Sequence, residues 1–317
     1  MAKMQYLMSS RAKTQQVTIP QGTRIICISD IHGSLDELIR LLDKVKFCDD
    51  DLLFLLGDHF TKGQKPQETL RFLIELCKKR NVYALRGNSD MPSERLCENE
   101  NQWIESLPHI IDTQNYTFVH GGLTSDNLYE QDAWACMKND AFLEQDLRFD
   151  KWVVVGHWPV YNYCHEIPCC NPIVDEQAHI IAIDGGMGTK ALVGQLNAFI
   201  IQDGVFSFET VDSFPVFIAE KKQSETGGTL NITWNDRAIR PIEKGELLSI
   251  VQHVKTDIEL VMPTVAIWRD WDDSFCGCSC GTDYWLPVDI GDNLCLLGDY
   301  NDRLLCKKDG VIGWVWK

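Results

Sequence analysis

The feature that most constrains this chain is an alternation of short apolar runs and amphipathic segments in its N-terminal part. Residues 24–29 (RIICIS) and 51–58 (DLLFLLGD) are apolar runs of strand length. Residues 34–47 and 66–80 carry leucines at helical spacing, and 81–88 form a third apolar run. This β-α-β-α-β order predicts an α/β fold with parallel strands, in which ligands bind beyond the carboxyl ends of the strands.

The strand pattern continues to residue 210 and then changes character. Further strand candidates lie at 116–122, 152–157 and 179–186, and residues 196–210 form a hairpin pattern around Asp203-Gly204. Beyond residue 212 the chain has a polar, glycine-containing stretch and no helix-length periodic segment. We therefore expect two domains, an α/β domain at 1–220 and a β-rich region at 221–317.

Composition limits the classes of partner and compartment. The 317 residues include 30 Lys and Arg against 46 Asp and Glu, a net charge of −16, which argues against a nucleic-acid partner. There is no apolar run of 18 residues, so we expect no membrane span. The 13 cysteines are odd in number, and the first sixteen residues contain no apolar stretch of the signal-peptide kind. A reduced, cytoplasmic chain is the expectation.

Side chains of metal-ligand type stand at the ends of the predicted strands. They are Asp30 and His32 after the first strand, Asp58 after the second, Asn88 after the third, His120 at the end of the fourth and His157 at the end of the fifth. Glycines adjoin these strand ends and let the backbone approach closely. Six such residues in register predict one site.

The types of these six side chains favour a pair of metal ions. Asp, His and Asn together suit hard or borderline divalent ions such as Mn, Fe and Zn, and none of the 13 cysteines lies at these strand ends. Six ligands serve two ions if one carboxylate bridges them. Two ions about 3.5 to 4 Å apart would activate a water or hydroxide and hold the oxygens of an in-line displacement at phosphorus. The pattern therefore predicts metal-assisted hydrolysis of a phosphate ester.

The ordered motifs D-x-H-G, G-D, G-N, H-G-G, G-H-x-P and D-G-G resemble those of the calcineurin-like metallophosphoesterases, over roughly residues 24–210. Pro159 in the fifth motif favours the phosphoprotein-phosphatase branch, which includes Ser/Thr phosphatases and symmetrical diadenosine tetraphosphatases. The resemblance implies a four-layer α/β/β/α sandwich with two divalent ions, Mn or Fe, with Zn as an alternative. It implies that Asp30 and His32 hold metal 1, that Asp58 bridges, and that Asn88, His120 and His157 hold metal 2.

Two motifs depart from those of that branch. Its members carry G-D-x-x-D-R-G and G-N-H-E, in which the His is a general acid supported by the Asp, and the Arg binds phosphate. This chain has Thr61, Lys62 and Ser89 at the Asp, Arg and His positions. A general acid contributes about 10² to 10⁴ in rate. Because this chain lacks the His that supplies it, we expect substrates whose leaving groups have a low pKa. Lys62 keeps a cation for phosphate but loses bidentate recognition.

Four further residues are candidates for roles beside the ligands: His59, Arg86, Asp90 and Asp184. His59 is either a relocated general acid or a solvated loop residue. Arg86 is either structural or a phosphate contact, and Asn88 would also contact substrate. We expect Asp90 and Asp184 to support the ligands, Asp184 through its match to the D-G-G motif.

The C-terminal part resembles a bacterial SH3-like barrel through Asp309-Gly310 and Gly313-Trp314-Val315, over about residues 255–317. Such modules bind peptides in some proteins and only pack or dimerise in others. Its aromatic residues Trp268, Trp271 and Trp285 are either a recognition surface for a peptide or core.

Two cysteine groups are left over: Cys164, His165, Cys169 and Cys170 in one, and Cys276, Cys278 and Cys280 in the other. A metal or redox site is one interpretation of each, and reduced loop residues are the other. The spacing of the first group matches no common structural zinc pattern.

The sequence thus predicts a dinuclear-metal phosphoesterase acting on a phosphorylated small molecule or a phosphoprotein. A dinucleoside polyphosphate hydrolase or a phosphodiesterase is the alternative within the same chemistry. A catalytically impaired metal-binding scaffold that works through its SH3-like domain is the alternative of another class, and the missing acid motivates it.

Overall fold

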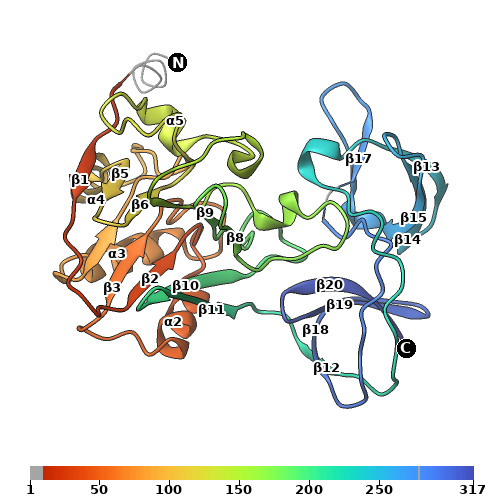
Figure 1. Cartoon of the computed structure of the whole chain (residues 1–317). Helices are drawn as coiled ribbons and strands as arrows, with labels where there is room; N and C mark the ends of the chain where they lie inside the picture. The colour runs from red at the N-terminus through yellow and green to blue at the C-terminus, as the bar shows by residue number, and fades with distance from the viewer. Residues whose placement is uncertain (1–9, 278) are drawn as a thin grey trace. The chain divides into compact units, whose positions relative to one another are not determined.

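The computed structural model describes residues 10–277 and 279–317 (Figure 1). The chain divides into two compact units. The first comprises residues up to 160, 172–189 and 194–212, and the second comprises 161–171, 190–193 and 213–317. The second unit thus takes in two short segments from within the predicted first domain. The boundary near residue 221 stays a prediction.

A five-stranded sheet with the order β11-β10-β2-β3-β4 carries the predicted N-terminal alternation. Its parallel strands are β2 (Ile25–Ile28), β3 (Leu52–Leu55) and β4 (Val82–Ala84). The hairpin of β10 (Leu196–Gln202) and β11 (Val205–Val211) joins β2 antiparallel, and Asp203-Gly204 form its turn, as predicted.

Helices cover one side of this sheet. They are α2 (Leu35–Lys44) and α3 (Pro66–Leu76), and α4 (Glu98–Ser106) packs against α3. Leu38 and Leu41 of α2 are fully buried against Ile26 and Ile28 of β2, so the apolar face that the leucine spacing predicted is the buried one. The two predicted crossover helices are confirmed.

A six-stranded sheet faces the first one. Its order is β1 (Thr14–Gln16), β5 (Ile110–Asp112), β6 (Tyr116–Val119), β7 (Trp152–Val155), β9 (Ile180–Ala182) and β8 (Ile173–Asp175). Buried side chains of both sheets share one core, in which Phe54 of β3 stacks on Phe118 of β6 with ring centroids 4.0 Å apart. The short helix α5 (Ala133–Met137) and the 3₁₀ turn η1 (Phe142–Glu144) lie in the connections, and the 3₁₀ turn η2 (Val160–Tyr163) begins where the chain passes to the second unit. The mixed α/β architecture is confirmed.

The second unit has no α-helix among its described residues, and its strands form three separate sheets. They are β12 (Val216–Ile218) with β18 (Asn293–Tyr300), β19 (Arg303–Lys308) and β20 (Val311–Trp316); β13 (Ile239–Lys244) with β14 (Leu248–His253) and β15 (Glu259–Pro263); and β16 (Ile267–Arg269) with β17 (Phe275–Gly277). The 3₁₀ turns η3 (Trp234–Asp236) and η4 (Thr264–Ala266) complete it. In Figure 1, β18, β19 and β20 lie side by side in dark blue.

The residues that suggested an SH3-like barrel have mixed surroundings. Trp314 is buried with Leu305 and Ile312, so it is core. Trp271 is 98% exposed, whereas Trp285 is half-buried and stacks on Trp316. Because β15 pairs with β14 rather than with β18–β20, residues 255–317 do not form one sheet. The SH3-like assignment stays a prediction.

The twelve described cysteines are all free thiols, and Cys278 lies outside the described residues. In the described part of the chain, one group of side chains lies close enough together to hold a metal ion: Asp30, His32 and Asp58. This group contains no cysteine. No helix of this part combines the length and apolarity needed to cross a bilayer.

Candidate metal centre

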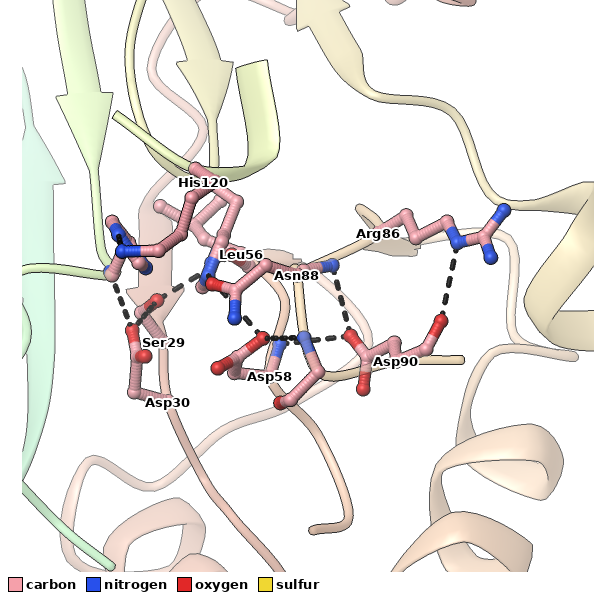
Figure 2. Close-up of polar contacts among 12 residues, drawn as sticks. Ser29, Asp30, Leu56, Asp58, Arg86, Asn88, Asp90 and His120 are labelled. Atoms are coloured by element: carbon pink, nitrogen blue, oxygen red, sulfur yellow. Dashed lines mark hydrogen bonds and ion pairs between the residues drawn. The ribbon is translucent and has the colours of Figure 1, made fainter. Parts of the chain in front are cut away.

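The ends of five strands bring the six predicted ligands together. Asp30, Asp58 and Asn88 follow the parallel neighbours β2, β3 and β4, and His120 and His157 follow β6 and β7 of the facing sheet. Figure 2 shows Asp30, Asp58, Asn88 and His120 turned toward a common centre. The sequence predicted this convergence from strand ends alone.

The backbone at the site is unusual in a way that supports function. The φ angles of Asp30, His32, Asp58 and His157 are 53°, 48°, 54° and 64°, in the left-handed region. Such residues cost about 1 to 3 kcal/mol each and cluster at functional sites. Glycine is required nearby, because a Cβ on Gly87 would lie 2.2 Å from Asp58 Oδ1. The close approach predicted for the glycines is confirmed there.

The first group of side chains is Asp30, His32 and Asp58, all buried. His32 Nε2 lies 3.7 Å from Asp30 Oδ1 and 3.5 Å from Asp58 Oδ2. Burial raises the pKa of Asp30 to about 6, and burial lowers the pKa of His32 to about 3. Burial also opposes ionisation of Asp58, yet His120, His32 and hydrogen bonds from Ser89 hold its pKa below the ordinary value.

The second group is Asn88, His120 and His157. One terminal atom of the Asn88 amide lies 3.2 Å from His120 Nε2 and 2.7 Å from His157 Nδ1. His120 Nε2 is also 3.3 Å from Asp58 Oδ1. Asp58 therefore directs one carboxylate oxygen to a histidine of each group.

Each of these histidines is held from behind through its other ring nitrogen. His120 Nδ1 is 2.6 Å from the carbonyl oxygen of Leu56, and His157 Nε2 is 2.7 Å from Asp140 Oδ1. His32 Nδ1 is 3.3 Å from Thr61 Oγ1. These contacts leave the inward nitrogens free of a proton, as metal ligation requires.

Of the three residues that depart from the family motifs, Thr61 and Lys62 contact His32, and Ser89 contacts Thr61. Lys62 Nζ is 3.3 Å from His32 Nε2, so the predicted cation stands at the site. Thr61 Oγ1 donates a hydrogen bond to Ser89 Oγ at 2.9 Å. Lys62, like Asn88, is a sequence-predicted substrate contact that the fold brings to the centre.

The remaining candidates lie away from the centre or behind it. The Asp90 carboxylate accepts hydrogen bonds from the N–H groups of Gly87, Asp58 and His59, so it fixes two ligand-bearing loops. Arg86 Nε donates to the Asp90 carbonyl oxygen at 3.1 Å, and Figure 2 shows its guanidinium directed away from Asp58. His59 is not solvated; it is fully buried, with Nε2 2.8 Å from the Leu85 carbonyl oxygen.

Asp140 and Lys138 are neighbours of the site that the sequence did not single out. Both follow α5, and they form an ion pair with each other. Lys138 Nζ lies 3.3 Å from His157 Nε2. The hydrogen bond from His157, opposed by burial and assisted by Lys138, holds the pKa of Asp140 at about 2. No local pattern marks this pair, because the contact forms across 17 to 19 residues of irregular chain.

Residues 23–181 match the family model described as calcineurin-like phosphoesterase. The chain belongs to this family. A symmetrical bis(5'-nucleosyl)-tetraphosphatase of Buchnera aphidicola is 45% identical over 65 residues, which are 20% of this chain and 23% of the relative. A Caenorhabditis elegans protein named serine/threonine-protein phosphatase PP1-delta is 34% identical over 87 residues, 27% of each chain. The chain thus spans about a quarter of the length of these relatives.

Among solved structures, a putative diadenosine tetraphosphatase aligns with 63% of this chain and 98% of its own, at 20% identity and a TM-score of 0.46.

The metals that the calcineurin-like family implies can be tested against the residues present here. Asp30, Asp58 and Asp184 are buried as neighbours, and Asp184 Oδ2 has no hydrogen-bond partner among the described residues. Neighbouring buried carboxylates need a counter-charge. With imidazole and amide groups beside them, they fit divalent cations.

Proposed function

We propose that this member of the family is a metal-dependent phosphoesterase with two ions. Asp30 and His32 would hold the first ion, Asn88, His120 and His157 the second, and Asp58 would bridge. The observation that carries this assignment is the position of Asp58, whose Oδ2 lies 3.5 Å from His32 Nε2 and whose Oδ1 lies 3.3 Å from His120 Nε2. Mn or Fe are the proposed ions, with Zn as the alternative.

The ions, when bound, would lower the pKa of a water molecule and neutralise charge on phosphoryl oxygens. The chain's own residues would orient the substrate. Lys62 is exposed at the edge of the site beside His32 and would offer its ammonium group to a phosphoryl oxygen. Asn88 would hold the substrate together with the second ion. Arg86 is engaged with Asp90, so we assign it a structural role.

The proposed substrate is a phosphorylated small molecule or a phosphoprotein. The relatives named above support both, since one is a nucleotide hydrolase and the other a protein phosphatase by name. Peptide binding by a C-terminal SH3-like module is a further proposal, for which the exposed Trp271 is the candidate contact. The cytoplasm is the proposed location, consistent with the free thiols of the described cysteines.

The test is a metal-dependent assay with a direct count of bound metal. We expect Mn²⁺ to stimulate hydrolysis of p-nitrophenyl phosphate, a chelator to abolish it, and elemental analysis to find two ions per chain. An equal rate with and without chelator would refute the proposal. Two bound ions without hydrolysis across phosphomonoesters, diesters and dinucleoside polyphosphates would favour the scaffold alternative instead.

A further inference from the structure

Thr61 and Ser89 form a bridge of hydroxyl groups between two candidate ligands. His32 Nδ1 lies 3.3 Å from Thr61 Oγ1, and Thr61 Oγ1 donates to Ser89 Oγ at 2.9 Å. The main-chain N–H of Ser89 donates to Asp58 Oδ1 at 2.9 Å. The chain of contacts therefore runs from a ligand of the first ion to the bridging carboxylate.

The direction of donation along this bridge is fixed at its start. Lys62 Nζ is 3.3 Å from His32 Nε2, and an ammonium group only donates, so Nε2 is an acceptor and Nδ1 carries the proton. A metal ion at Nε2 imposes the same tautomer. Thr61 must then accept from His32 and donate onward to Ser89.

The far end of the bridge is directed to Asp58. The main-chain N–H of Ser89, 2.9 Å from Asp58 Oδ1, holds this carboxylate in place. Ser89 is half-buried, and Met91 N donates to its carbonyl oxygen at 2.9 Å, which fixes its backbone. The Thr61 hydroxyl proton is thus used within the bridge, toward Ser89, and the main chain of Ser89 holds the carboxylate.

We propose that Thr61 and Ser89 are positioning residues that hold His32 and Asp58 in ligating geometry and supply no proton to the reaction. Resting on the proposed phosphoesterase function, this favours substrates whose leaving group departs as a stable anion. Aryl phosphates and phosphoanhydrides meet that condition, whereas alkyl phosphates such as phosphoserine do not. An alkoxide leaving group requires proton donation from a group with a pKa near the working pH, and a Ser or Thr hydroxyl is not such a group.

The positioning role is tested by metal affinity, without turnover. In full-length Thr61→Val and Ser89→Ala, we expect the dissociation constant for Mn²⁺, measured by competition with a chelating dye, to rise about 10-fold or more, since loss of such supporting contacts costs about 10 to 100-fold. Thr210→Val on the edge strand β11 is the matched control and should bind as the parent does. Unchanged Mn²⁺ affinity in both site variants, with unchanged melting temperature in chelator, would overturn the role.

The substrate preference is tested with phosphate esters of graded leaving-group pKa. We expect kcat/KM of the parent to fall steeply from p-nitrophenyl to phenyl to alkyl phosphate, and both variants to lower every rate by one common factor. A variant that slows phenyl phosphate more than p-nitrophenyl phosphate would show that the pair donates a proton. If the parent enzyme hydrolysed p-nitrophenyl, phenyl and alkyl phosphate with equal kcat/KM, the preference for stable leaving groups would also be overturned. Absence of all hydrolysis would refute the phosphoesterase function, while the Mn²⁺ measurement still decides the positioning role.

Discussion

The two halves of the candidate metal centre differ in charge and in what holds their histidines. The first half has the carboxylate Asp30 with His32, which a neutral hydroxyl, Thr61, supports from behind. The second half has the neutral ligands Asn88 and His120 with His157, which the half-exposed carboxylate Asp140 supports. One half thus carries its negative charge inside the site and the other outside it. The charge of Asp58 lies between them.

The largest expected effect comes from removing what the two halves share. Asp58→Asn keeps the shape but removes the charge that faces both His32 and His120. Stabilisation by metal ions is worth several kcal/mol, and about 1.4 kcal/mol is tenfold in rate, so we expect phosphoesterase activity to fall by about 10³-fold. Elemental analysis should find fewer than two ions per chain.

A matched control is Asp36→Asn. Asp36 is an exposed acid of α2 that forms an ion pair with Lys65. It should keep both ions and full activity. If Asp58→Asn kept two ions and its activity, Asp58 would not be the bridge, and the division into two halves would be wrong.

The next effect separates the halves. Asp140→Asn should weaken binding of one ion only, about 10 to 100-fold, because a carboxylate behind a histidine ligand fixes its tautomer and strengthens it as a donor. Titration with Mn²⁺ should change from two tight sites to one tight and one weak site. Asp140→Glu should restore part of the loss.

Asp146→Asn, an exposed acid in the same loop, is the control and should bind both ions as the parent does. Lys138→Met removes the cation 3.3 Å from His157 Nε2 and should not weaken metal binding. Equal weakening of both ions in Asp140→Asn would mean that the halves are not independent.

These neighbours also mark how far the sequence could predict the site. The ligands were predictable because strand ends are local features, and parallel strands bring their carboxyl ends to one edge. The role of Asp140 was not predictable, because its contact with His157 depends on how the irregular chain after α5 folds back. The hydrogen bond between Thr61 and Ser89 was not predictable either, because the sequence shows that both residues differ from the family motifs but not that they contact each other.

The same limit applies to the fold. Helix and strand periods predicted the elements of both sheets that lie near the site. They gave no sign that residues 161–171 and 190–193 belong with the second unit, since such segments have no periodic pattern and are placed by tertiary packing. His59 shows the converse error of local reasoning, because a histidine in a polar-looking loop is fully buried.

The smallest expected effect is a difference in how the halves respond to acid. In the metal-free protein burial raises the pKa of Asp30 to about 6, whereas burial lowers the pKa of His32 to about 3 and of His157 to about 4. Between pH 6 and pH 5 the ion must therefore displace a proton from Asp30, while these two histidines are already neutral. Affinity at the first half should fall about tenfold per pH unit below 6, and His157 should add no acid loss at the second half down to about pH 5.

Calorimetric titration of Mn²⁺ at pH 5 in buffers of different ionisation enthalpy checks this, and the released protons should include one from Asp30. Asp184→Asn is the needed control, because burial and the neighbouring Asp30 raise the pKa of Asp184 as well. If Asp184 is not a ligand, this variant should release as many protons as the parent does. An acid loss shared equally by both ions would mean that the negative charge is not confined to the first half. The contrast between a charged inner half and an externally supported half would then fail.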